Sequence, residues 1–225
     1  EEKAASQVLR DIEKSICSDN VAVTGTSSAG GQFRALGQWI NNSPTSDDVA
    51  AVPTPFKTPA ESILSDGDEM LTESNFNGML TSIFEETGEQ GDHILVAGTT
   101  VRNEIIDGFT RLIHADSGHD KPFNVGNSTV FNQGDGSEVV YNVEIFQGPY
   151  GIVKIISANP KCMPNQKRAY LLDPSLLGYA EAMSMGSTML EDQGGGPRGY
   201  IDHMGTLLCK GPNGLGKITN FNFVA

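Results

Sequence analysis

Helical and strand periodicities occupy different halves of this 225-residue chain, and that division constrains the fold more than any single motif. Apolar residues recur at helical spacing in residues 1–18, 72–88 and about 100–114. After residue 138 they alternate or form short β-like runs. Helices and strands segregated in this way are typical of an α+β fold with a mainly antiparallel sheet, and not of a regular βαβ series.

The clearest predicted helix has recognisable ends. Thr72 is a good N-cap, and Gly88 is a residue type that ends helices. Between them lies an apolar stripe at positions i, i+3, i+4, i+7 and i+8, made of Phe76, Met79, Leu80, Ile83 and Phe84. The pattern predicts an amphipathic helix that packs one face on a core.

The second half of the chain predicts several strands. Residues 139–158 predict a β-hairpin, because two alternating segments flank the turn QGPYG. RAYLLDP, HMGTLLCK and KITNFNFVA predict further strands, and HILVAG predicts one in the first half of the chain, between two predicted helices. The segment SLLGYAEAMSMGSTML is ambiguous between a short helix and a strand.

The stretch GPNGLGKI resembles a nucleotide-binding P-loop, since Gly211, Gly216 and Lys217 have the required spacing. Ile218, however, stands where the magnesium-binding Ser or Thr belongs, and the β-like residues TNFNFVA follow it instead of a helix. We therefore exclude an NTPase. We interpret the stretch as a Gly-rich hairpin loop and Lys217 as a surface or interface cation.

Few residues suggest catalysis or metal binding. His114 and His119 lie beside two aspartates in HADSGHD and could bind a metal, but the segment reads as a polar loop without helical His spacing. His203 follows Asp202 without a serine or cysteine elbow. The pair Asp173-Pro174 is explained by an aspartate N-cap with proline at the first helical position. We predict no catalytic, cofactor-binding or metal site.

Charge and cysteine content exclude other classes. A net charge of −13 argues against general nucleic-acid binding, which needs clustered Lys and Arg. The three cysteines are widely spaced and form no C-x-x-C pair, so they favour buried reduced thiols. No apolar run reaches the length of a membrane span, no signal peptide opens the chain, and the start at Glu1 reads as the middle of a helix.

The order of these segments resembles the major capsid (major head) proteins of tailed phages, in particular the SU10-type group. VLRDIEKSICSDN resembles the end of that family's long spine helix, and FRALGQWINN resembles the segment after it. The residues 71–109 are similar to its helix–strand–helix unit, and 141–174 to its hairpin and LLDP strand. TLLCKGPNGLGKITNF is similar to its terminal strands.

The resemblance implies the Hong Kong 97-type fold. It implies a peripheral, spine-helix domain at about 1–22 and 160–225 and an axial domain at about 23–159, with a polar insertion near 115–137. The family's N-terminal arm and extended loop, expected before the spine helix, are missing. This leads to the hypothesis that the chain is a monomeric fragment.

The implied function is that of a structural, non-enzymatic subunit that assembles into hexamers and pentamers of an icosahedral head around double-stranded DNA. The resemblance implies that the protein is made in the host cytoplasm and is then located in the virion. The partners are other copies of the chain, scaffold, portal and decoration proteins, and packaged DNA bound non-specifically, without membrane or cofactor. The alternatives left open are a small hydrolase or metal-dependent enzyme using His114, His119 or His203, and another shell or tail structural module.

Overall fold

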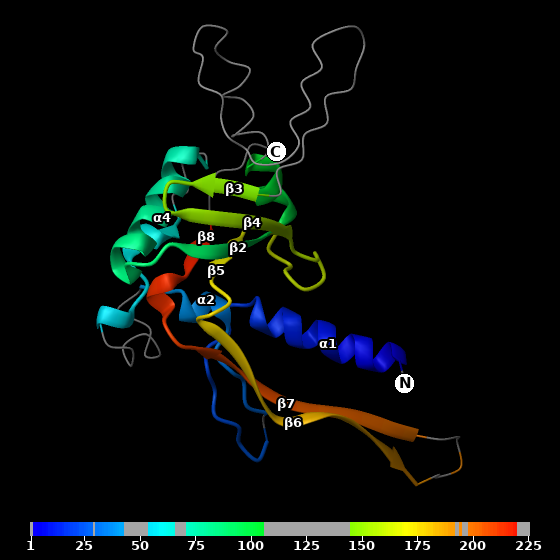
Figure 1. Ribbon diagram of the computed structural model, residues 1–225. Helices are drawn as coiled ribbons and strands as arrows, with labels where there is room; N and C mark the ends of the chain where they lie inside the picture. The colour runs from blue at the N-terminus through cyan, green and yellow to red at the C-terminus, as the bar shows by residue number, and fades with distance from the viewer. Residues whose placement is uncertain are drawn as a thin grey trace, which may run out of the picture.

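A mixed six-stranded sheet and a long two-stranded hairpin organise the chain in the computed structural model (Figure 1). The structure describes residues 2–28, 30–42, 54–65, 71–105, 145–191, 194 and 198–219. The sheet and its helices form one part of the molecule, while the hairpin and the first helix extend from it. The predicted α+β class is confirmed.

Two helices lie where their apolar stripes predict them, α1 (Glu2–Ile16) and α4 (Glu73–Thr87). The short helix α2 (Leu36–Trp39) was not predicted. Thr72 caps α4 as predicted, because its hydroxyl accepts a hydrogen bond of 3.2 Å from the Asn75 amide, and Gly88 ends it in the left-handed conformation at φ 70°. Residues 99–105 are also helical, and the remainder of that predicted helix lies outside the described residues. Short 3₁₀-helices occupy η1 (Thr54–Phe56), η2 (Ala60–Ser62) and η3 (Pro212–Gly214).

The six-stranded sheet has the order β1-β8-β5-β2-β4-β3. Its strands are β1 (Ile63–Leu64), β2 (Gly91–Ala97), β3 (Ile145–Gly148), β4 (Gly151–Ser157), β5 (Ala169–Leu172) and β8 (Gly216–Ile218). Three of the pairings are antiparallel, but β1 with β8 and β2 with β4 are parallel. The sheet is thus mixed, because β2 and β4 are joined by a long connection rather than by a hairpin.

The two predicted hairpins have different outcomes. The prediction over 139–158 is confirmed for β3 and β4, whereas 139–144 lie outside the described residues. The predicted hairpin through Gly211–Ile218 is wrong, because its two flanking strands belong to different sheets. The strand before this stretch is β7 (Arg198–Cys209). It pairs with β6 (Leu177–Leu190), the segment whose sequence is ambiguous between helix and strand, and the two form a long hairpin.

Both faces of the six-stranded sheet pack against other elements, but the second face is covered only in part, since Ile152 and Ile156 of β4 are exposed. On one face α4 buries its stripe against the sheet, and Phe76 meets Phe146 of β3 edge to face at 5.1 Å. On the other face lie α2, the end of α1 and the base of the hairpin, packed around Tyr170, Ile40 and Leu215. β5 serves both cores, because Ala169 and Leu171 face one and Tyr170 faces the other.

Candidate functional site

The residues considered for catalysis do not form a catalytic group among the described residues. His203 lies within β7, and its ring stacks on Tyr179 of β6 with centroids 5.8 Å apart. Its Nε2 atom lies 2.8 Å from the Tyr179 hydroxyl. The tyrosine hydroxyl therefore occupies the hydrogen-bonding position that a serine or cysteine nucleophile would need. His114 and His119 lie outside the described residues. Within the described ranges, no three His, Cys, Asp or Glu side chains gather closely enough to hold a metal ion.

Asp173 caps a turn and not a helix. Its Oδ1 atom accepts hydrogen bonds from the amide and the hydroxyl of Ser175, at 2.8 and 2.7 Å. Residues 174–176 form a turn that leads directly into β6. The predicted helix N-cap is therefore wrong, since Pro174 fixes a turn as readily as a first helical residue.

The near P-loop also proves to be structural. Gly211 leads into η3, and Gly216, Lys217 and Ile218 form β8, so a strand stands where a P-loop needs a helix. Of the two alternatives predicted for Lys217, the surface cation is wrong, and the interface cation stays a prediction. Its side chain is half-buried, and its Nζ atom donates a hydrogen bond of 3.0 Å to the carbonyl of Gly37.

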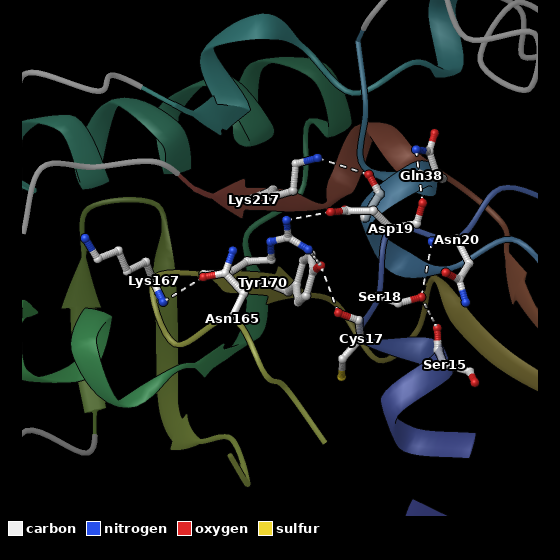
Figure 2. A network of polar contacts seen from close by, with 12 residues as sticks. Ser15, Cys17, Ser18, Asp19, Asn20, Gln38, Asn165, Lys167, Tyr170 and Lys217 are labelled. Atoms are coloured by element: carbon white, nitrogen blue, oxygen red, sulfur yellow. Dashed lines mark hydrogen bonds and ion pairs between the residues drawn. The ribbon is translucent and has the colours of Figure 1, made fainter. Parts of the chain in front are cut away.

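Lys217 belongs to a group of polar residues that we call the polar joint: Cys17, Asp19, Gly37, Arg168, Tyr170 and Lys217 (Figure 2). The joint connects the segment between α1 and α2 to the strands β5 and β8. The Arg168 guanidinium lies 2.5 Å from the Asp19 carboxylate and donates a bond of 3.2 Å to the Tyr170 hydroxyl. That hydroxyl donates in turn to the Cys17 carbonyl at 3.2 Å. These bonds hold the end of α1 against the sheet.

Burial sets the electrostatics of the joint. It raises the pKa of the Tyr170 hydroxyl, which Arg168 only partly opposes, and so Tyr170 stays a neutral donor. Burial also lowers the pKa of Lys217, while Asp19 acts in the opposite direction. Asp19 thus serves two cations at once. Its removal would leave Arg168 and Lys217 facing each other without a counter-charge.

A second feature is a row of exposed apolar side chains along the hairpin, which we call the apolar ribbon. Every residue of β6 from Glu181 to Leu190 is exposed. Met189 is 71% exposed and Met204 is 59% exposed, which is unusual for side chains of this kind. The ribbon consists of Tyr179, Met183, Met185, Met189, Leu190, Tyr200, Met204 and Leu208.

The helix α1 runs beside the hairpin, since Ala4 near its start lies close to Met189 and Tyr200. Nearer the base it leaves an apolar groove of about 550 Å³, lined by Leu9, Ile12 and Ile16 of α1 and by Leu177, Met185 and Leu207 of the hairpin. Leu9 is itself 51% exposed. Tyr179 and Met185 belong to both the groove and the ribbon, whereas Leu208 pairs with Gly178 and faces the other side, so the ribbon side chains lie on both faces of the hairpin.

This arrangement has the properties of a surface that binds protein. Monomeric proteins rarely expose a continuous row of large apolar side chains, and methionines are common where such surfaces meet a partner. Over the described ranges, the structure holds no helix that is both long and apolar enough to cross a bilayer.

The family model for the SU10 major capsid protein matches residues 1–222. The chain belongs to the SU10 major capsid protein family. No curated protein matches the chain. The SU10 family match covers the helices, the sheet and the hairpin alike, so the resemblance in the order of segments is confirmed.

As a member of the SU10 family, the chain is a structural protein of a phage capsid and is located in the virion. Such a protein functions by assembling with copies of itself. The apolar ribbon is then the kind of surface that the SU10 chain needs, because a shell subunit buries apolar area against its neighbours.

Sequence reasoning missed most of the residues that this surface and the polar joint use. The ribbon left a signal, since four of the seven methionines lie in β6 and β7, three of them within MSMGSTM. The polar joint left no signal in the sequence. Asp19, Arg168 and Lys217 lie in segments that are far apart along the chain, and only the folded sheet brings them together.

Proposed function

We propose that this chain has the Hong Kong 97-type fold and assembles into hexamers and pentamers that close into an icosahedral head around double-stranded DNA. The observation that carries the proposal is the apolar ribbon on a hairpin that extends away from the core. A two-stranded hairpin is marginally stable in water by itself, and three or more strands or a packed face are needed to stabilise it. A neighbouring subunit would supply that face.

The greater exposure of apolar side chains on the ribbon than on the rest of the molecule favours assembly into rings. One face of the sheet is covered by α4 and the other only in part, since Ile152 and Ile156 of β4 are exposed, whereas the ribbon carries the two most exposed large apolar side chains of the described residues. A contact between the ribbon of one subunit and a different surface of the next is heterologous, and such contacts close into rings when the rotation fits. Six-fold and five-fold rings of one subunit are what a closed icosahedral shell requires.

We also propose a division into two domains on this basis. The six-stranded sheet with α2 and α4 is the axial domain, and α1 with β6 and β7 is the peripheral, spine-helix domain. β5 and β8 come from the stretch 160–225 that the resemblance assigns to the peripheral domain, yet they pair with β2 and β1. Their pairing is the reason to place both strands in the axial domain. The predicted insertion at 115–137 lies outside the described residues.

The remaining partners follow from charge and from the capsid role. With a net charge of −13, the chain meets packaged DNA without specific binding, since like charge keeps the genome from adhering to the wall. Scaffold, portal and decoration proteins would contact the assembled rings. We propose no enzymatic activity, because the family is structural and His203 is engaged by Tyr179.

The test is assembly of the full-length protein, observed by electron microscopy. Met189→Glu and Met204→Glu, made together, place two charges in the ribbon and should abolish closed shells. The subunit itself should keep its stability to within about 0.5 kcal/mol, because both side chains are exposed. Ser74→Glu adds a charge at an exposed position of α4 and is the matched control. Normal shells from the doubly substituted protein would contradict the proposal.

A further inference from the structure

A cavity of about 330 Å³ opens between the end of α4, the start of β2 and the turn before β6. Its ionisable wall is acidic. Glu86, Glu89 and Asp173 contribute three carboxylates, while Lys210 contributes one ammonium group. The ammonium is already engaged, because its Nζ atom donates a hydrogen bond of 3.3 Å to the Ser175 carbonyl.

His93 of β2 lies in the wall of this cavity without a hydrogen-bond partner for its buried Nδ1 atom. The residue is only 5% exposed. Buried polar side chains are usually satisfied, so an unpartnered imidazole needs an explanation. Burial lowers its pKa, with Asp173 and Asp92 acting in the opposite direction. His93 is therefore neutral near pH 7 and adds no cation to the cavity.

The imidazole and the carboxylate of Asp173 converge on one point. A Cβ atom placed on Gly91 would lie 3.0 and 3.2 Å from the Cε1 and Nε2 atoms of His93 and 3.6 Å from Oδ2 of Asp173. Ser175 holds Asp173 by its other oxygen, Oδ1, at 2.7 Å, so that Oδ2 is directed at this point. Because Gly91 carries no side chain, an incoming hydrogen-bond donor can approach these two groups over its Cα atom.

The remainder of the cavity is apolar. Ile83 and Leu176 line it, and Phe56, which is 52% exposed, lies at its opening. A ligand with a hydrocarbon stem and a cationic end matches this arrangement. The stem packs on the aliphatic wall, an aromatic ring at the opening favours a cation, and the charged end donates to the carboxylate.

We infer that this cavity binds a lysine or arginine side chain of a neighbouring copy of the chain. A second copy is the favoured source, because a capsid subunit is surrounded by copies of itself and this chain exposes cations such as Lys3, Lys14 and Lys154. The inference rests on the proposed assembly. It adds to the ribbon a polar contact that fixes the angle between two subunits, as charge pairs commonly do at interfaces.

The first experiment uses the unassembled full-length subunit, so that it does not depend on shell formation. The imidazole signal of His93 is followed by NMR during titration with the Nα-acetyl methylamides of arginine, lysine and norleucine. We expect a saturable shift with the two cationic probes and none with norleucine, which carries the stem without the charge. Asp173→Asn should weaken binding of the cationic probes at least tenfold. Asp92→Asn is the control, because Asp92 also acts on His93 but does not line the cavity.

The second experiment compares shells assembled from the same two variants. Asp173→Asn should lower the temperature at which shells dissociate, and Asp92→Asn should not. Equal shifts with norleucine, or no saturable shift with either cationic probe, would overturn the inference even if shells form normally. A shift induced by zinc alone, with no response to the cationic probes, would also overturn it and identify a metal site instead. Cationic binding in a subunit that never forms shells would leave the cavity as described and contradict the proposed assembly.

Discussion

The guanidinium of Arg168, the residue directly before β5, lies 2.5 Å from the carboxylate of Asp19, which follows α1 by only three residues. This ion pair joins parts of the chain that are 149 positions apart. It lies where the helix and hairpin meet the sheet, and so the angle between the two parts depends on it. The side chain of Arg168 is only 15% exposed, whereas that of Asp19 is 44% exposed.

Replacing Asp19 with alanine should destabilise the subunit. Arg168 would remain largely buried without its partner, which costs about 1–3 kcal/mol. The measurement is the free energy of unfolding in urea. Asp92→Ala removes an exposed carboxylate from β2 and should change that free energy by less than about 0.5 kcal/mol. Equal effects of the two substitutions would show that the ion pair contributes nothing.

Gly37→Ala should be destabilising at the same joint. The new Cβ atom would overlap the Asp19 carboxylate and lie 2.8 Å from the Ser18 carbonyl, so α2 would have to shift. We expect a loss of about 1–3 kcal/mol in the free energy of unfolding. Gly78→Ala is the control, because nothing lies within 4 Å of its Cβ position on α4. That substitution should instead stabilise the helix by about 0.5–1 kcal/mol, and a loss at Gly78 would contradict this account.

Removal of the α4 cap should have a moderate effect. Thr72→Ala deletes the acceptor for the Asn75 amide and should cost about 1 kcal/mol in urea unfolding. Thr72→Ser keeps the hydroxyl and should retain most of the stability. If serine and alanine behave alike, the side-chain hydrogen bond is not the source of the effect.

Stability should fall in alkaline solution because of the Cys209 thiol. Burial raises its pKa from 9.0 to about 11, although the Gly211 amide and Arg34 oppose the shift. Since the folded-state value is the higher one, the contribution to stability is complete below pH 9 and is lost as the pH rises from 9 to 11. Two pKa units correspond to roughly 2–3 kcal/mol.

Cys209→Ala tests the predicted direction of this pH dependence. The difference in unfolding free energy between the natural chain and the variant, measured under reducing conditions, should shift in favour of the variant above pH 9. A difference that stays constant over the whole pH range would contradict the prediction. The opposite shift of Lys217 is present in both proteins and cancels in the comparison.

Local patterns predicted local structure well. Thr72, the stripe of α4 and Gly88 define a helix whose two ends can be identified from neighbouring residues alone. The turn QGPYG likewise predicts the β3–β4 hairpin, whose partners are close in sequence. In each case the deciding interactions lie within about one turn or one hairpin of each other, and so the sequence contains them.

The remaining features depend on contacts between distant segments. The parallel pairing of Ile63 with Lys217 spans most of the chain and has no local signal. The error at Lys217 has the same origin, since its partner Gly37 comes from the opposite end of the sequence. His93 was not recognised because the residues that surround it come from α4, η3 and the turn after β5. The family resemblance succeeded where periodicity could not, because it uses the order of all segments together.

The long hairpin joins the sheet part of the molecule at its base, where Leu177 pairs with Cys209, and α1 runs beside it. With 14 residues in β6, its far end lies roughly 45 Å from that base. A rotation of about 5° of the hairpin and α1 together would move the tip by roughly 4 Å. In the proposed shell, subunits at the vertices and on the flat facets meet at different angles. Such a rotation would accommodate both, while the packed sheet keeps one conformation.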